Sequence, residues 1–400
     1  MPRTPDPDAP EDDLDDLPDT HPPQPVYYAE QALLGALLLE PHRLNNVAGI
    51  EPDSFSNYAH GALFSAIRAL PAPNPNQHAQ DTSWLNAVLT AAREHARGLT
   101  ASYLHTLVQV CPWPKHASAY ARMIETEHAR RTLRAHAERL TLTATDATLP
   151  HPVPDTLAEA DALAYAVDDI AARFPAHSGS LPRTPAPPSA TNSHNNEEAV
   201  EEERLLLATA TAHPADVEQM RWLTADDFTQ PLHAGLWQCL TALARRRAPV
   251  DPVTVLWEAQ QRGLLASGAE PTELLDLLGA PAGSAEYWGE RILRRSVLAT
   301  AHHVGLRIGA FTDDPATTPY QLILGSRRAL ADLSAVRARW HHATSPAPTT
   351  TPARTRAAPP PGLARHGPRR HPPVSPADPE PAGGRTRVRA RPPAEASMPS

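Results

Sequence analysis

Lysine is almost missing from this chain of 400 residues: Lys115 stands alone beside 35 arginines. A nucleotide-binding P-loop requires Gly-x-x-x-x-Gly-Lys-Ser/Thr, because its lysine contacts the terminal phosphates. Lys115 lies in PWPKH with no glycine near it, and the glycines of residues 279–289 lead to no Lys-Ser or Lys-Thr pair. We therefore expect no nucleotide site of the usual kind, no cofactor and no ATPase activity.

Cysteine is scarce as well, and the two that occur, Cys111 and Cys239, form no C-x-x-C pair. We expect both to be free thiols in a reducing cytoplasm. Twenty histidines invite a metal site, but the H-E-x-x-H pattern is missing, and adjacent histidines on a helix point in different directions. No Gly-x-Ser-x-Gly stretch occurs either. The sequence thus predicts no metal site and no catalytic residue.

Long apolar runs are also missing. No segment approaches the 18 apolar residues of a membrane span, and no basic stretch leads into an apolar one at the start of the sequence. We expect a soluble, cytoplasmic protein without a membrane partner. Aromatic residues make up 5% and do not alternate with arginines, so stacking platforms for single-stranded nucleic acid are not indicated.

What the chain does contain is an internal duplication. YYAEQALLGALLLEP at 27–41 aligns with VEEERLLLATATAHP at 200–214, and the alignment continues without a gap. From Glu30 to Leu70 it has ten identities in 41 pairs. Chance similarity between leucine-rich helices would match leucines, whereas these identities include a proline, a phenylalanine and a histidine: Pro41 with Pro214, Phe55 with Phe228, and His60 with His233. A repeat this long is a domain.

Apolar residues recur at helical spacing in both copies. Between His60 and Leu70 they fall close to i, i+3, i+4 and i+7, and residues 233–243 repeat the pattern. Neither copy contains a convincing alternating strand. We expect an all-α fold with two tandem small bundles of five or six short helices, each followed by a trailing helix, at 155–174 and at 319–340.

Composition divides the chain into five parts. Proline-rich segments bury too little apolar surface to offset chain entropy, so we interpret them as disordered. The head carries eight Asp or Glu and the tail nine Arg against three acids, so the net charge of −9 is an average over unlike parts. The expected parts are a disordered acidic head at 1–25, a helical domain with its trailing helix at 26–174, a disordered linker at 175–197, a second, diverged helical domain with its trailing helix at 198–342, and a disordered Pro/Arg-rich tail at 343–400.

An ordered series of motifs runs through the first copy. It begins with AEQALLGALLLEP, PDSF and H-x-x-L-F, continues with an Asp-Thr that opens a helix, and ends with a Tyr-Leu-x-x-Leu helix and a Tyr-Ala-x-x-Ile helix followed by arginines. This series resembles the N-terminal (collar) domain of the DnaB-type replicative DNA helicase. The resemblance covers 27–174 well and 198–340 more weakly, because AEQALLGALLL has become EEERLLLATATA in the second copy.

The resemblance implies a collar domain without a motor. In that family this domain forms paired collars and contributes to binding primase and loading factors, while the ATPase is a RecA-like domain after the linker helix. The implied function is a non-catalytic interaction protein of DNA replication, with primase, the replicative helicase or its loader as partners. Two alternatives stay open: a regulatory protein that binds DNA through its Arg/Pro-rich tail, and an accessory subunit of a helicase whose motor is encoded separately.

Collar pairing also implies an arrangement for this chain. Because both copies lie on one chain, we expect the helix at 155–174 to pack on the helix at 319–340 or on the second bundle, which gives an intramolecular pseudo-dimer.

Arginines supply the candidate contact residues. Those in the last bundle helix of each copy form either a solvated helix face or a surface for a partner or nucleic acid. Those in the tail are suited to hold phosphates. The candidates are Arg130, Arg131, Arg134, Arg291, Arg294, Arg295, Arg385, Arg387, Arg389 and Arg391. His60 and His233 are expected to be hydrogen-bonded core residues, and Glu30 and Glu203 to support a helix start.

Overall fold

The computed structural model describes residues 24–47, 49–174 and 196–345, and this part of the chain contains helices and no strand. The expected all-α fold is confirmed. The first copy contains α1 (Pro25–Leu39), η1 (Pro41–Asn46), η2 (Pro52–Ser54), α2 (Tyr58–Ala69), α3 (Pro75–His78), α4 (Ser83–Arg93), α5 (Ala101–Val110), η3 (Pro114–His116), α6 (Ala117–Thr145) and α7 (Pro152–Arg173). The second contains α8 (Asn196–Ala212), α9 (Pro214–Gln219), η4 (Ala225–Asp227), α10 (Pro231–Arg245), α11 (Pro252–Gln261), η5 (Leu264–Ser267), α12 (Pro271–Leu278), α13 (Ala285–Asp313) and α14 (Pro319–Thr344).

The segments expected to be disordered fall almost entirely on residues 1–23, 175–195 and 346–400, which lie outside the described residues. All described residues belong to one compact unit. The five-part domain division therefore stays a prediction.

The first bundle is formed by α1, α2, α4, α5 and the start of α6. Its helices begin where the sequence offers a cap: the Asn57 side chain accepts from the second and third backbone N–H groups of α2, and the Thr100 hydroxyl accepts from the third N–H of α5. Leu33, Leu63 and Ile124 are fully buried in its core. Among the described residues, those that form this core all belong to the first copy.

The second bundle repeats this plan with α8, α10, α11, α12 and the start of α13. Proline occupies the first turn of α10, α11 and α12, where its missing N–H has no intrahelical partner to lose. Asp251 and Thr254 form a reciprocal capping box on α11. Leu206, Leu236 and Ile292 are fully buried, at positions equivalent to core residues of the first copy.

The last helix of each bundle is longer than the sequence analysis expected. α6 and α13 each have 29 residues and extend well past the bundles. In α6 the buried positions continue as Leu133, Ala137, Leu140 and Ala144, a spacing of i, i+4, i+7 and i+11. Because two of these are alanines between polar residues, the apolar stripe is weak in the sequence, and the expectation of short helices was wrong for these two.

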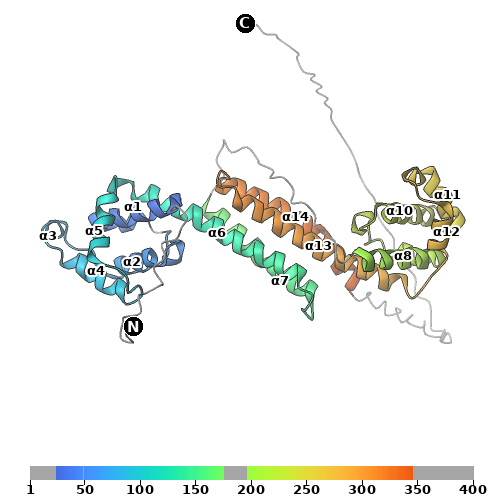
Figure 1. The fold of residues 1–400 in the computed structure, drawn as a ribbon, viewed down its shortest axis with the longest axis horizontal. Coiled ribbons are helices and arrows are strands. Elements are labelled where there is room, and N and C mark those ends of the chain that lie inside the picture. Colours follow the sequence, from blue (N-terminus) through green and yellow to red (C-terminus); the bar gives the residue numbers. More distant parts are fainter. Residues whose placement is uncertain (1–23, 48, 175–195, 346–400) are drawn as a thin grey trace, which may run out of the picture. The chain divides into compact units, whose positions relative to one another are not determined.

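These long helices and the trailing helices form the four-helix seam, which we define as α6, α7, α13 and α14 (Figure 1). α7 packs against α6, and α14 packs against α13. α6 also lies along α13, and α7 contacts α14. The expected packing of the two trailing helices on each other is confirmed. Each leucine that the seam buries contributes about 1.5–3 kcal/mol.

The seam and the second bundle share one core. Leu133 and Leu163 of the first copy belong to the same buried cluster as Val304 and Leu333 of the second. The described residues thus have two hydrophobic cores, and the second one includes the C-terminal half of α6 and all of α7.

α6 and α13 lie close together at Gly305. A Cβ there would lie 2.2 Å from the Thr141 hydroxyl and 2.8 Å from the carbonyl oxygen of Ala137. Gly309, one turn further along α13, would place its Cβ in open space. The close packing of α6 and α13 therefore requires glycine at position 305 and leaves room for a side chain at position 309.

We expect Gly305→Ala to lower the free energy of unfolding by about 1–3 kcal/mol, because one helix must shift away from the other. Gly309→Ala is the matched control and should raise the free energy of unfolding by up to about 1 kcal/mol, because alanine favours the helix. Urea denaturation of the full chain measures both. Equal effects of the two substitutions would contradict the close approach of α6 and α13.

Candidate protein–protein interface

A buried Glu–His pair anchors the start of α2 to α1 in the first copy. The Glu30 carboxylate accepts from the backbone N–H of Ser56 at 2.5 Å and from its hydroxyl at 2.7 Å. Its other oxygen lies 2.6 Å from His60 Nδ1. His60 Nε2 lies 2.6 Å from the Tyr103 hydroxyl of α5, so the pair joins three helices.

The second copy repeats this anchor at equivalent residues. Glu203 accepts from the N–H of Thr229 at 2.6 Å and from its hydroxyl at 2.8 Å, and its other oxygen lies 2.8 Å from His233 Nδ1. The prediction that both histidines are hydrogen-bonded core residues is confirmed. Both glutamates bind the residue that precedes the N-cap of a helix, which agrees with their expected role at a helix start.

Burial disfavours the charged form of Glu30, but the hydrogen bonds from His60 and Ser56 outweigh it and hold the pKa of Glu30 below its ordinary value of 4.5. Burial also raises the pKa of the Tyr103 hydroxyl. The polar groups of Glu30, His60 and Tyr103 thus bind one another inside the bundle. These hydrogen bonds hold α1 against α2.

Arg130 crosses from the first copy to the second. The side chain is 7% exposed and donates to four backbone carbonyls where α13 turns into α14. The acceptors are Thr312 at 3.2 Å, Asp314 at 2.7 Å, Pro315 at 3.4 Å and Thr317 at 2.8 Å. The Glu127 carboxylate lies 3.2 Å from the guanidinium and balances its charge. We call this contact the Arg130 clamp.

The two neighbouring arginines of α6 also bind within the chain. Arg131 donates to the carbonyls of Ser54 at 2.7 Å and Phe55 at 3.3 Å. Arg134 donates to the carbonyl of Thr312 at 3.1 Å and to the Asp313 carboxylate at 2.6 Å. α6 therefore places one arginine on its own bundle and two on the end of α13.

The arginines of α13 differ in their surroundings. Arg291 pairs with Glu198 at 2.9 Å and with Glu202, and Arg295 also pairs with Glu202. Arg294 is exposed, and no polar partner lies beside it in the described part of the chain. Arg385, Arg387, Arg389 and Arg391 lie outside the described residues. Contact of any of these arginines with a partner or with nucleic acid stays a prediction.

Ion pairs join the trailing helices along the seam. Arg327 of α14 donates to Asp168 of α7 at 2.7 Å, and Arg337 donates to Asp161 at 3.0 Å. Exposed pairs of this kind contribute about 0–1 kcal/mol each, so they set register and partner choice more than stability. These ion pairs were not predicted from the sequence. The available signal was the excess of acids on one trailing helix and of arginines on the other.

The seam is not symmetric between the copies. When α6 and α13 are aligned by Ile124 and Ile292, Arg130 corresponds to Leu298, which packs against the shared core. The clamp therefore exists on one side of the seam only. Together with the acidic α7 and the arginine-bearing α14, it makes the first copy complementary to the second rather than to itself.

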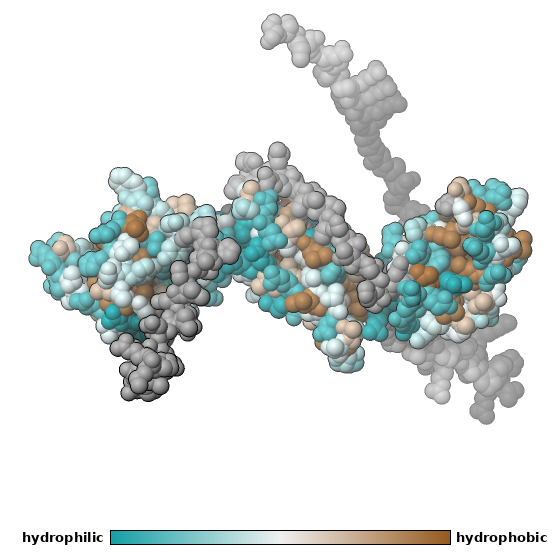
Figure 2. Space-filling view, in the orientation of Figure 1, coloured by the Kyte–Doolittle hydropathy of each residue, from teal (hydrophilic) through white to brown (hydrophobic). Residues whose placement is uncertain are grey.

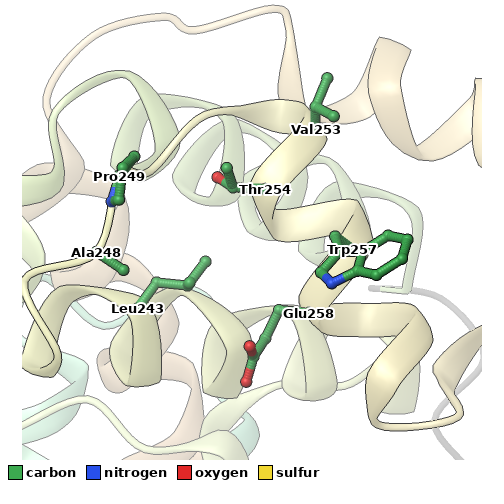
Figure 3. A pocket seen from close by; sticks show the side chains of 7 residues that line it. All are labelled: Leu243, Ala248, Pro249, Val253, Thr254, Trp257 and Glu258. Atoms are coloured by element: carbon green, nitrogen blue, oxygen red, sulfur yellow. The ribbon is translucent and has the colours of Figure 1, made fainter.

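An open apolar groove lies between α10 and α11 of the second bundle (Figure 3). It has a volume of about 350 Å³ and is lined by Leu243, Ala248, Pro249, Val253, Thr254, Trp257 and Glu258. Val253 and Trp257, one turn apart on α11, are 65% and 62% exposed. Figure 2 shows apolar residues at the surface of this bundle.

The described residues contain no cluster of three or more His, Cys, Asp or Glu able to hold a metal ion. None of the described helices is long and apolar enough to cross a membrane. The protein is therefore a duplicated all-α scaffold. One helical domain occurs twice, and the two copies pair through their last two helices.

The family model of the DnaB-like helicase N terminal domain matches residues 21–126 and 195–292, one segment in each copy and just over half of the chain. The chain belongs to this family. Neither a curated protein nor a solved structure matches it. The resemblance seen in the sequence is confirmed, and so is its presence as two tandem copies.

The Glu30 anchor predicts a pH dependence of stability. Because folding lowers the pKa of Glu30 below 4.5, its stabilising effect is complete above that pH and is lost as the pH falls through the folded-state pKa. We expect Glu30→Gln to lower the free energy of unfolding at pH 7 by about 1–3 kcal/mol and to reduce its loss between pH 5 and pH 3. Glu138→Gln, at an exposed position of α6, is the control. Denaturation at several pH values tests this, and an unchanged acid slope in Glu30→Gln would contradict it.

Proposed function

We propose that this chain is a non-catalytic interaction protein of DNA replication that acts in the cytoplasm through protein–protein contacts. Its partner is primase, the replicative helicase or the helicase loader. The observation that carries the proposal is the pair of DnaB-like N-terminal domains, joined by the four-helix seam within one chain. Lys115 is the single lysine of the sequence, which supports a role without ATP hydrolysis.

The seam supports an adaptor more than a ring subunit. A pairing surface that is filled within one chain is closed to a collar domain of another chain, because the intramolecular partner is present at millimolar effective concentration. The chain then meets other proteins through the outer surfaces of its bundles. Since the copies have diverged, these two bundles offer different surfaces and suit two different partners.

Arg294 is the candidate contact that the second bundle leaves free. It is exposed on α13 beside Arg291 and Arg295, both of which are paired with acids of α8. An unpaired arginine beside satisfied neighbours suits an acidic or carbonyl group of a partner. This supports the second bundle as one of the docking surfaces.

The alternative proposal is a regulatory protein that binds DNA through its tail. It rests on composition, since residues 345–400 carry nine arginines and three acids. Neutralising phosphates with four arginines releases counterions and produces a steep salt dependence. A helicase accessory subunit, with its motor encoded separately, is the remaining candidate and also acts through protein contacts.

Binding of the full chain to purified primase, replicative helicase and loader from the same host tests the proposal, with sedimentation velocity as the measurement. We expect binding to at least one of them with a Kd of about 1–10 μM, unaffected by ATP. Arg294→Glu should weaken it about tenfold or more at an unchanged melting temperature. Arg97→Glu, exposed in the loop between α4 and α5, is the matched control.

Duplex DNA is the competing ligand in the same experiment. Salt-dependent DNA binding that is lost when Arg385, Arg387, Arg389 and Arg391 become Gln, without binding to any of the three proteins, would contradict the adaptor and favour the regulatory protein. Absence of binding to all four ligands would contradict both.

A further inference from the structure

α11 of the second copy has an apolar outer face where the equivalent helix of the first copy is polar. α4 buries Trp84, Val88, Leu89 and Ala92, and α11 buries Val255 and Ala259, so the two helices can be aligned by Val88 with Val255 and Ala92 with Ala259. In that register, the exposed positions 86 and 90 of α4 correspond to 253 and 257 of α11. The first copy has asparagine and threonine there, and the second has valine and tryptophan. Val253 and Trp257 thus give α11 an exposed apolar edge, where Asn86 and Thr90 give α4 a polar one.

A basic run has appeared at the same edge. After Leu70 the first copy continues Pro-Ala-Pro, whereas after the equivalent Leu243 the second continues Ala-Arg-Arg-Arg. Arg246 pairs with Glu258 at 2.6 Å, and Arg262 pairs with the same carboxylate at 3.0 Å. The one acid that lines the groove is therefore already neutralised.

Arg247 occupies a backbone conformation that suits glycine. Its φ is 53°, the one positive φ of a non-glycine residue among the residues described. It follows the C-cap of α10, and its N–H donates to the carbonyl of Ala244 at 2.9 Å. Glycine is the usual residue here, because a side chain in the left-handed region is strained. The arginine is exposed beside Ala248 of the groove and has no polar partner in the described part of the chain.

We propose that this groove docks the acidic head of a second copy of the chain, through residues 11–17. That segment reads Glu-Asp-Asp-Leu-Asp-Asp-Leu and combines five carboxylates with two leucines. The leucines fit an apolar groove bordered by Val253 and Trp257. The carboxylates match Arg246, Arg247 and Arg262, which outnumber the nearby acids Asp251 and Glu258.

The length of the connection favours a second copy over the same chain. Residues 18–24 join the segment to α1 and span at most about 25 Å. The first bundle lies beside Arg131, whose neighbour Arg130 binds Thr312 near the end of α13. The second bundle begins at Ala285, so 27 residues of helix, about 40 Å, separate the two bundles along α13. This separation exceeds the reach of about 25 Å, so the head does not span the distance to the groove of its own chain. The head of one chain therefore binds the groove of another chain.

The test uses a fluorescein-labelled peptide of residues 8–20 and the full chain with its own head neutralised by Glu11→Gln, Asp12→Asn, Asp13→Asn, Asp15→Asn and Asp16→Asn. We expect saturable binding by fluorescence anisotropy that weakens with added salt. Val253→Asn with Trp257→Thr restores the residues of the first copy and should weaken binding at least about fivefold. Replacing both peptide leucines by serine should do the same.

Arg247→Gly separates docking from folding. It should raise the melting temperature, because glycine suits the positive φ, and should also weaken peptide binding. If Arg247 only stabilised the fold, the substitution would not raise the melting temperature and weaken peptide binding at the same time. Arg328→Gly, at an exposed position of α14, is the control for charge and should leave binding unchanged.

Three results would overturn the proposal: a neutral leucine-bearing peptide that binds as tightly as the acidic one, unchanged binding in Val253→Asn with Trp257→Thr, or unchanged binding in Arg247→Gly. The first would assign the groove to an apolar partner segment. These outcomes are independent of the tests with primase, helicase and loader, because they involve this chain alone.

Discussion

The Arg130 clamp carries the buried guanidinium of the first copy to the carbonyls that end α13 of the second. Hydrogen bonds from a charged donor are stronger than neutral ones. The guanidinium gains four acceptors and the balancing charge of Glu127, so it is buried without being left unpaired. Around this contact α6 and α13 lie close enough that Gly305 accepts no side chain. The Arg130 clamp and the close approach at Gly305 thus act together with the shared core and the seam ion pairs in holding the two copies together.

Duplication with divergence explains how one chain pairs with itself. A symmetric pair of first copies would bring two acidic α7 helices together, and a symmetric pair of second copies would bring two arginine-bearing α14 helices together. Both arrangements place like charges in contact, whereas the seam places each acid beside an arginine. The unlike pair is therefore favoured. Since the pairing surfaces are then filled, surfaces elsewhere on the bundles remain for other proteins.

Sequence alone predicted the parts of the fold that rest on local pattern. The trailing helices, the buried histidines and the all-α class follow from apolar spacing and from identities such as His60 with His233. The length of α6 did not follow, because Ala137 and Ala144 give a weak stripe that becomes a buried face only when α13 covers it. The burial of Arg130 could not be predicted from the sequence either, because an arginine on a helix is buried only if another part of the chain packs over it. The groove beside Trp257 required knowing which face of α11 is buried.

The central claim is that the two copies pair within one chain, and chemical cross-linking tests it most directly. Asp161→Cys and Arg337→Cys place thiols at an ion pair of the seam, in a chain whose Cys111 and Cys239 are replaced by serine and alanine. Two versions of this chain with different tags are expressed together, purified at low micromolar concentration and treated with a short bismaleimide. The account predicts that the cross-link forms within single chains, which keep the mass of a monomer. A covalent dimer that carries both tags would contradict it.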